Sequence, residues 1–491
     1  MINPTPIFPG FHLQTLRQKR RTEQQKVADE LAILQAKTIS QLGAVFGNFV
    51  PQQAIQTTET GAHSRRRIFS AENTFWAFMS QVLSADGSCQ EVVRKMQAFA
   101  SVKGGDLPSS STAAYCKARA KLDPLNLHKV FQHTAEELDQ LSSQLGPWNR
   151  RVIVIDGTGI SMPDTSENQE PWPQQSQSKE GCGFPQAKLV GCFSLQTGGL
   201  LSYACGNKSD HELTLFRQQW DLFEKGDIAL GDKGFCNYRD VALLQQRGVD
   251  SVMSLRGKPF KKREIIKKIS DNDCLVRWKR PQRIKTYGKE EWSQLPSCIL
   301  VRQTRIQVAI PGFRTQEIYL VTTLTDPAIY SSEALGELYF QRWDVELYFR
   351  DIKTTLGMDI LRCKTPEMIR KELSLHWIAY NCIRRLIVEA AEEAETPIRK
   401  VSFKGALQAL RNWEPHLNQT RISKKERFRM ISELYACIAQ KTVPKRPGRS
   451  EPRAVKRRPK SHRLLTKPRA EMIVPKHRNR NWENKWRKPL S

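Results

Sequence analysis

Apolar and polar positions alternate with a helical period in the first third of the chain, over residues 65–145. The segment 74–83, TFWAFMSQVL, predicts a buried helix, and residues 89–100 predict a second. A third helix is predicted within 109–122, SSSTAAYCKARAKL, because serine and threonine residues that can cap a helix precede its alanines. The pattern therefore predicts a helical N-terminal domain over residues 1–145.

The pattern changes at Arg151, where β-branched residues begin to dominate. The segment 151–162, RVIVIDGTGISM, predicts a buried strand that ends at Asp156 and Gly157. After a loop rich in Pro, Gln and Ser, two apolar runs flank the turn at Gln196–Gly199 and predict a β-hairpin. The later predicted elements are a helix at 211–223, a strand ending at Asp232, a helix at 238–248 and a strand at 251–255. This order predicts an α/β domain, a mixed sheet covered by helices, that begins with residues 146–256.

Residues 257–316 are dense in Lys and Arg and contain short β-prone pieces. The distance from Asp232 to Glu346 is 346 − 232 = 114 residues, more than a minimal sheet needs. We therefore expect an inserted basic, β-rich subdomain here. The run EIYLVTTLT, at the start of residues 317–362, is expected to return the chain to the main sheet.

The segment 338–357, LYFQRWDVELYFRDIKTTLG, contains no Pro or Gly before Gly357 and predicts one continuous helix. Further helices are predicted at 366–395, 401–413 and 427–440, within a C-terminal helical region over 363–440. Residues 441–491 are rich in Pro, Lys and Arg, and this composition predicts a disordered basic tail.

The net charge of +28 and the pI of about 9.8 indicate an anionic partner. Nucleic acid is the leading candidate, because Lys and Arg that neutralise phosphates release counterions. A protein kept soluble by its positive charge, or one that binds a membrane surface, is the alternative. Lys117, Arg119 and Lys121, on the third predicted helix, are candidate DNA contacts, and the Arg65–Arg67 run could add phosphate contacts.

Several other classes of protein are disfavoured by the sequence. The eleven cysteines are scattered without a C-x-x-C pair, so neither a disulfide framework nor a zinc site is indicated. An apolar run of 18 residues is absent, which predicts no membrane span. The first residues lack a continuous apolar stretch, so no secretory signal is expected.

Four polar side chains of the segment 338–357 share one face of the predicted helix. The steps from Tyr339 to Glu346 and from Glu346 to Lys353 are seven residues each, so each returns within about 20° of the same direction. Arg342 lies one turn before Glu346, about 40° away. An exposed helix face with an ordinary Arg–Glu pair is the alternative explanation.

Asp156 and Asp232 each stand where a predicted strand ends beside a glycine. The ends of strands in α/β sheets are where ligand-binding groups lie, although Asp beside Gly is also common in turns. The cluster Asp210–Glu212 is a weaker candidate, since acids are ordinary at a helix start. Trp343, Tyr348 and Phe349 are expected to pack in the core rather than to stack on bases.

Three carboxylates from separate segments would suit phosphodiester chemistry. Two divalent ions about 4 Å apart can activate a water or a 3′-hydroxyl and stabilise the leaving oxygen. Carboxylate oxygens are suitable ligands for Mg²⁺. We infer that Asp156 bridges two ions, while Asp232 and Glu346 hold one each. Arg342 and Lys353 would then clamp phosphates, and Tyr339 would contact a phosphate or a base.

The spacing Y-x2-R-x3-E-x6-K from Tyr339 to Lys353, with Asp156 in IDGT and Asp232 in GDKGF, resembles DDE transposases of the insertion-sequence-four family. The resemblance covers residues 151–362 well and is looser elsewhere. It implies an RNase H-like mixed sheet core, with a β-rich insertion between the second aspartate and the glutamate.

The resemblance also implies a function. Such proteins bind the terminal inverted repeats of their own element in double-stranded DNA, cut the strands and join them to a target. It implies two Mg²⁺ ions, with Mn²⁺ as a substitute, a dimer or larger assembly on paired ends, and a cytoplasmic, nucleoid-associated bacterial protein. Two alternatives stay open: a catalytically silent DNA-binding protein derived from a transposase, and an RNase H-like nuclease without strand transfer.

Overall fold

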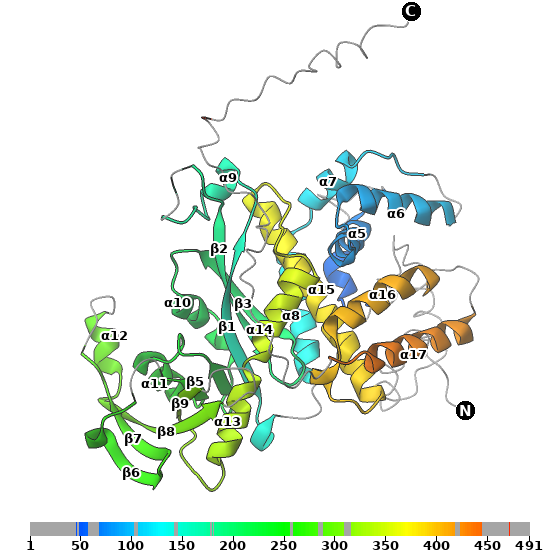
Figure 1. Cartoon of the computed structure of the whole chain (residues 1–491). Coiled ribbons are helices and arrows are strands. Elements are labelled where there is room, and N and C mark those ends of the chain that lie inside the picture. Colours follow the sequence, from blue (N-terminus) through cyan, green and yellow to red (C-terminus); the bar gives the residue numbers. More distant parts are fainter. Residues whose placement is uncertain are drawn as a thin grey trace, which may run out of the picture.

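The computed structural model describes residues 46, 49–56, 68–102, 107–141, 146–176, 179, 181–255, 259–282, 288–308, 316–417, 423–443 and 471. The Arg65–Arg67 run and nearly all of the basic tail lie outside these residues. In Figure 1 an α/β half, built on one sheet, lies beside a helical half. Among the described helices, none combines the length and the apolar character needed to cross a membrane.

One mixed sheet of nine strands runs through the α/β half, so the described chain is mixed α/β as predicted. The strand order is β3-β2-β1-β4-β5-β9-β8-β7-β6. β2 is antiparallel to both β1 and β3, whereas β4 is parallel to β1 and β5 is parallel to β4. These five strands are β1 (Val152–Ser161), β2 (Gln186–Ser194), β3 (Leu200–Asn207), β4 (Ile228–Gly231) and β5 (Asp250–Ser254). The predicted hairpin is confirmed as β2 and β3.

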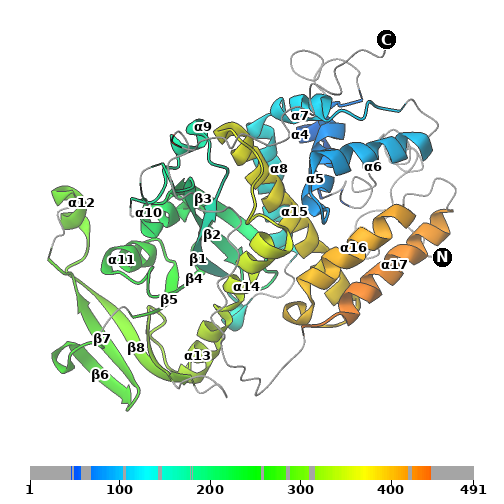
Figure 2. The ribbon, with the colours of Figure 1, turned by 45° about the horizontal axis from the view of Figure 1, so that its top comes forward.

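The strands of the expected insertion extend this sheet instead of forming a sheet of their own. They are β6 (Ile265–Ser270), β7 (Asp273–Lys279), β8 (Cys298–Val308) and β9 (Gln316–Thr322). A short helix, α12 (Lys289–Gln294), lies between β7 and β8. β9 pairs antiparallel with both β5 and β8, which confirms that the run beginning at residue 317 returns to the main sheet. Figure 2 shows β6, β7 and β8 projecting away from the helical half.

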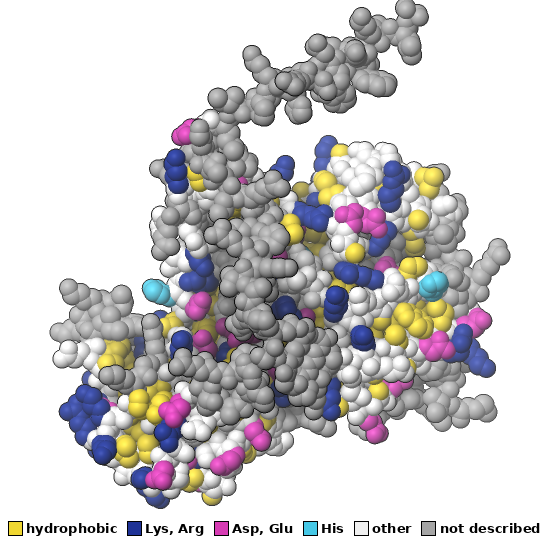
Figure 3. All heavy atoms as spheres, viewed as in Figure 1, with side chains coloured by type: hydrophobic (Ala, Val, Ile, Leu, Met, Phe, Trp, Pro, Cys, Tyr) yellow, Lys and Arg dark blue, Asp and Glu magenta, His cyan; other side chains and the backbone are white. Residues whose placement is uncertain are grey.

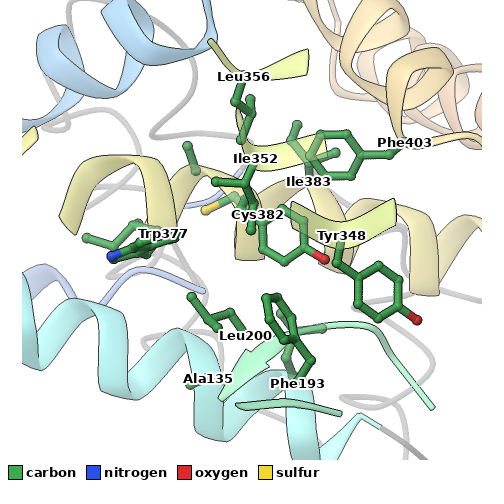
Figure 4. Close-up of a cluster of buried hydrophobic side chains, with 14 of the residues drawn as sticks. Ala135, Phe193, Leu200, Tyr348, Ile352, Leu356, Trp377, Cys382, Ile383 and Phe403 are labelled. Atoms are coloured by element: carbon green, nitrogen blue, oxygen red, sulfur yellow. The ribbon is translucent and has the colours of Figure 1, made fainter. Parts of the chain in front are cut away.

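Side chains alternate between two cores because successive strand residues face opposite sides of the sheet. On β1, Ile153 and Ile155 join the cluster that contains Val241 of α11, whereas Val152 and Val154 join the cluster on the other face. The first face carries α10 (Glu212–Arg217) and α11 (Tyr238–Gln246). Figure 4 shows the second cluster, where Phe193 and Leu200 face side chains of α15. The central strands are therefore fixed from both sides.

The helical half shares this second core. α5 (Ala71–Leu83) contains the predicted segment 74–83 and begins three residues before it, with Ser70 accepting a hydrogen bond from the Asn73 amide at 3.2 Å. The remaining long helices are α6 (Cys89–Val102), α7 (Ala113–Ala120), α8 (Pro124–Gln140), α15 (Pro366–Glu393), α16 (Phe403–Leu417) and α17 (Lys424–Gln440). Side chains from α8, α15 and β3 belong to one buried cluster, so the two halves pack together.

The prediction of one continuous helix before Gly357 is wrong. α13 (Ser332–Gln341) ends, α14 (Asp344–Arg350) begins after two intervening residues, and a π-helical turn, η4 (Asp351–Thr355), follows. At the first break the amides of Arg342 and Trp343 donate to carbonyls three residues back, at 3.1 and 3.3 Å. The tighter winding lets Trp343 stack on Phe340, with ring centroids 5.6 Å apart. Aromatic packing therefore overrides the local preference for a single helix.

Two predicted boundaries also differ. β1 continues to Ser161, because residues on both sides of Asp156 pair with β2. The predicted helix 211–223 is divided into α10 and a 3₁₀ turn, Trp220–Leu222. Between them the Gln219 amide group donates to carbonyls of Val190 and Leu215, both at 3.2 Å, which ties the break to β2.

Candidate active site

The register of β1 and β4 places the two aspartates side by side. These parallel strands pair through Ile155 and Gly231, so Asp156 and Asp232 are the first residues beyond the last pair. Neighbouring strands lie about 4.8 Å apart. The prediction that Asp156 lies at the end of its strand is therefore wrong. Asp156 lies instead where the pairing of β1 with β4 ends. Asp232 follows directly after its strand, which confirms that prediction.

One backbone amide holds each aspartate. The Gly157 amide donates to Oδ1 of Asp156 at 2.8 Å, and the Gly234 amide donates to Oδ1 of Asp232 at 2.7 Å. A Cβ atom at Gly234 would lie 2.9 Å from that same Oδ1, so the turn after Asp232 requires glycine. Among the described residues, the second oxygen of each carboxylate has no hydrogen bond. Both aspartates therefore keep an oxygen available for a ligand.

Gly191 allows the glutamate helix to approach the aspartates. It pairs directly with Asp156, and a Cβ atom there would lie 2.8 Å from Cε2 of Phe193 and 3.2 Å from Cζ of Phe349 on α14. The missing side chain lets Phe349 rest on the sheet, one turn from Glu346. Sequence reasoning missed Gly191, although a glycine inside a strand is a known sign of close approach.

Arg342 and Tyr339 are buried beside Glu346. Arg342 is 7% exposed, and its Nη2 lies 3.6 Å from Oε1 of Glu346. Its guanidinium also lies 5.5 Å from the ring centre of Tyr339, which is 3% exposed. The expectation that these two side chains contact DNA does not fit this placement, because neither reaches the surface. Arg342 instead holds the glutamate.

Lys353 lies on the same face of the sheet as the two aspartates, where it contacts strand β1. Its Nζ donates to Oγ1 of Thr158 at 3.2 Å and to the carbonyl of Gly159 at 2.8 Å. Thr158 is two residues beyond Asp156, so the two side chains point to the same side of the sheet. The carboxylate of Asp359 lies 3.7 Å from the ammonium group. The predicted lysine is therefore brought to the aspartates even though the helix is broken.

Electrostatics link Asp156 to the other two acids. Burial, the largest cause, and the carboxylates of Asp232 and Glu346 together raise the pKa of Asp156 to about 6, while the Gly157 amide and Arg342 act in the opposite direction. Within the described part of the chain, no three Asp, Glu, His or Cys side chains lie close enough to hold a metal ion. The Glu346 side chain is 55% exposed and turned toward Arg342. The acids thus share a face without closing on one point.

The other candidates are placed as follows. Lys117 and Lys121 are exposed on α7 and after it. Arg119 is buried: it donates to Oε1 of Gln81 at 3.0 Å and lies 4.8 Å from the ring centre of Phe78. Its guanidinium is thus used inside the helical half, and the expectation that it contacts DNA does not fit.

Glu212 lies across the sheet from the aspartates. A Cβ atom at Gly157 would be 2.9 Å from the Glu212 carboxyl carbon, and Gly157 faces the side opposite to Asp156. The cluster that includes Glu212 therefore stands apart from the three acids. Tyr348 and Phe349 are buried, as expected of core residues.

Comparison with known proteins places this geometry in a family. A family model described as "Transposase DDE domain" matches residues 147–382, which include all three acids, and "Insertion element 4 transposase N-terminal" matches residues 36–132. The transposase InsG for insertion sequence element IS4 of Escherichia coli (strain K12) is 27% identical over 340 residues, 67% of this chain and 72% of InsG. A transposase for insertion sequence element IS421 of Escherichia coli is 32% identical over 72 residues, 15% of this chain and 18% of its own.

A solved structure, the synaptic complex of piggyBac transposase with hairpin DNA, aligns with 79% of this chain and 82% of its own at 10% identity and a TM-score of 0.39. The two family models together cover the helical N-terminal residues and the sheet that carries the acids. The InsG match is the longer of the two relatives described above. The chain therefore belongs to the DDE transposases of the insertion-sequence-four family.

Proposed function

We propose that Asp156, Asp232 and Glu346 are the catalytic acids of this transposase. Members of the family are enzymes that cleave and transfer DNA strands. The observation that carries the assignment is the β1–β4 register, which puts both aspartates next to each other on the face that α14 covers. We further propose that the DNA sites are the terminal inverted repeats of its own insertion sequence.

The strands that hold these acids support an RNase H-like core. We assign to it β3, β2, β1, β4 and β5, because both aspartates follow the pairing of its two central strands. The strands from β6 to β8 would be the insertion between the second aspartate and the glutamate. Residues 1–145 would form the DNA-binding N-terminal domain, and residues 363–440 a helical C-terminal region.

The donor set fits a hard divalent cation. DDE transposases generally use divalent metal ions, and three carboxylates with free oxygens are suitable ligands for Mg²⁺. The raised pKa of Asp156 reflects burial first and repulsion by the two other carboxylates second, and a bound cation would offset both. We propose two Mg²⁺ ions, with Mn²⁺ as a substitute, held by Asp156, Asp232 and Glu346. When bound, such ions activate the attacking hydroxyl and stabilise the leaving oxygen.

The surrounding side chains prepare the acids for this role. Arg342 keeps Glu346 near the sheet, and the exposed glutamate can rotate toward the aspartates when a cation competes with the guanidinium. The Gly157 and Gly234 amides fix one oxygen of each aspartate and so orient the other. Lys353 places an ammonium group two residues beyond Asp156, where it would bind a phosphate beside the scissile bond.

DNA binding would involve more of the surface. Transposases act on DNA, and we propose double-stranded DNA bound by a dimer or larger assembly on paired ends. Lys117 and Lys121 remain our candidate contacts in the N-terminal helices, because both are exposed. Figure 3 shows Lys and Arg side chains spread over one face, including the region of β6 and β7. Exposed basic residues of those strands are Lys267, Lys268, Arg277 and Lys279.

The assignment is tested with Glu346→Gln and a matched control, Glu337→Gln, which changes an exposed glutamate on α13. Substrates are plasmids that carry the ends of the element, with Mg²⁺ present. We expect the first variant to bind the ends normally but to lose cleavage by at least about 10²-fold, while the control cuts as the wild type does. Normal cutting by Glu346→Gln refutes the assignment.

The same assay separates the two alternatives. A wild-type protein that binds the ends but never nicks them with Mg²⁺ or Mn²⁺ would be a catalytically silent DNA-binding protein. One that nicks but never joins a cut end to target DNA would be a nuclease without strand transfer. Joined products made by the wild type and absent with Glu346→Gln support the transposase.

A further inference from the structure

A small cavity lies beside α14. It has a volume of about 80 Å³ and is lined by α14, η4, α15, the start of α16 and Val443. Asp156, Asp232 and Glu346 are not among the residues that line it. The cavity is therefore distinct from the group of three acids.

Positive charges outnumber negative ones in its wall. Four basic side chains line it, against two acids. Both acids already have basic neighbours: Oδ2 of Asp344 lies 2.7 Å from Nε of Arg399, and Oδ1 of Asp351 lies 3.9 Å from Nη2 of Arg350. The other two basic side chains, Arg384 and Lys404, form no ion pair with any residue that the structure describes. The wall thus carries two more positive charges than negative ones, although Arg384 also lies close enough to Asp351 to lower the pKa of that carboxyl group.

Arg384 has little contact with water. It is 4% exposed, donates from Nε to the Thr197 carbonyl at 2.8 Å, and lies 5.2 Å from the ring centre of Tyr348. Burial also raises the pKa of Asp351 to about 6, which indicates a poorly hydrated wall. A buried cation that forms no direct ion pair is costly, so an anion in this cavity would be bound more strongly than at an open surface.

Lys404 adds a second cation from a different element. It lies in the first turn of α16, where the helix end also favours negative charge. Ser402, in the same wall, caps this helix by accepting the Gly405 amide at 3.1 Å. The guanidinium and the ammonium group together are suited to an oxyanion.

We propose that this cavity binds one phosphate group of the backbone of a nucleic-acid strand. A water molecule needs only about 10–15 Å³ of such space, so the cavity of about 80 Å³ has room for a phosphate group. The proposal rests on DNA as the partner of this chain, but not on the catalytic acids. Because none of the three acids lines the cavity, this phosphate is not the scissile one.

The experiment measures DNA affinity of the full chain against salt concentration in EDTA, where no cleavage occurs. The test variant is Lys404→Gln. The matched control is Lys400→Gln, which removes an exposed lysine four residues away that does not line the cavity. Each phosphate contact contributes about 0.9 to the slope of log K against log salt. We expect the slope of the test variant to fall by about 0.9, and that of the control by less than half as much.

The fall in slope has a simple consequence: the ratio of wild-type to variant affinity shrinks about 3.5-fold between 50 and 200 mM salt. Equal slopes for Lys404→Gln and Lys400→Gln overturn the proposal. Inorganic phosphate, titrated into the DNA-free protein, separates the sources. Micromolar binding that Lys404→Gln abolishes, with an unchanged DNA slope, would make this a site for free phosphate and overturn the nucleic-acid assignment.

Because all these measurements exclude metal ions, they are independent of catalysis. If the protein fails to cut DNA but shows the expected slopes, the catalytic assignment is refuted and the phosphate site is supported. If the protein cuts DNA but the two variants show equal slopes, the catalytic assignment stands and the phosphate site is refuted. Thermal unfolding of both variants checks that a difference in slope reflects binding rather than folding.

Discussion

Replacing Asp156 by asparagine is expected to stabilise the metal-free protein at neutral pH. Burial and the two neighbouring carboxylates raise the pKa of this aspartate from 3.8 to about 6. A shift of about two pKa units corresponds to about 3 kcal/mol of free energy that the folded state loses when the group is charged. Asparagine keeps the shape and an oxygen for the Gly157 amide but removes the charge.

The gain should depend on pH in a defined direction. Because the pKa of Asp156 is higher in the folded state, its contribution to stability is fully present below about pH 3.8 and is lost as the pH rises through 6. The variant does not titrate at this position. The difference in unfolding free energy should therefore grow from near zero at pH 4 to about 3 kcal/mol at pH 8.

Urea unfolding with EDTA, from pH 4 to pH 8, measures this difference. Asp221→Asn is the control, because the side chain of Asp221 is fully exposed. We expect the control to follow the wild type within about 0.5 kcal/mol at every pH. A variant no more stable than the wild type at pH 8, or a gain that does not vary with pH, would refute the electrostatic reasoning.

Magnesium adds a second arm to the same experiment. A ligand at 100 times its dissociation constant stabilises the folded state by about 2.7 kcal/mol. The wild type should gain this stability when Mg²⁺ replaces EDTA, whereas Asp156→Asn should gain little. Equal gains in the two proteins would count against Asp156 as a metal ligand.

Three further predictions concern a tightly packed glycine, a buried ion pair and a helix cap. Gly191→Ala should cost about 1–3 kcal/mol in urea unfolding and slow cleavage, because the new methyl group would lie 2.8 Å from Phe193 and 3.2 Å from Phe349; unchanged cutting would contradict the role given to this glycine. Asp273→Ala should cost about 3–5 kcal/mol, since it leaves Arg302, which is 1% exposed, without its counter-ion. Ser70→Ala should lower the stability by about 1 kcal/mol in thermal or urea unfolding, and no loss would show that the cap is dispensable.

The sequence predicted the central strands well because their apolar runs are buried on both faces. It placed Asp232 correctly, since β4 is short and a turn follows it at once. It ended β1 too early, because Gly157 and Gly159 are weak strand formers in isolation. Their place in the strand is secured by pairing with Val190 and Lys188 of β2, which no local pattern reveals.

The glutamate segment shows the limit of periodicity. Its composition favours a helix, and most of it is helical, but it breaks where Trp343 stacks on Phe340, and a π-helical turn follows α14. The faces computed from 100° per residue were therefore only approximate. Lys353 still arrives beside Asp156, because hydrogen bonds to β1 hold it there.

The candidate acids were found from spacing and family resemblance, and the structure brings them to one face. Residues whose role depends on a distant partner could not be predicted. Arg119 has the exposure of a core residue because Gln81, thirty-eight positions earlier, accepts its hydrogen bond. Gly191 matters because Asp156 lies across the strand from it and Phe349 lies above it.

Strand β9 pairs with both β5 and β8, so the strands of the insertion and those that carry the aspartates form one continuous hydrogen-bonded sheet. Its backbone bonds to β8 on one side and to β5 on the other, and β5 borders the strand that ends at Gly231. A force or ligand that tilted β6 and β7 would be transmitted through this ladder to Asp232. We expect an antibody fragment bound to the insertion to alter the amide exchange rates of β4, although it would touch none of its residues.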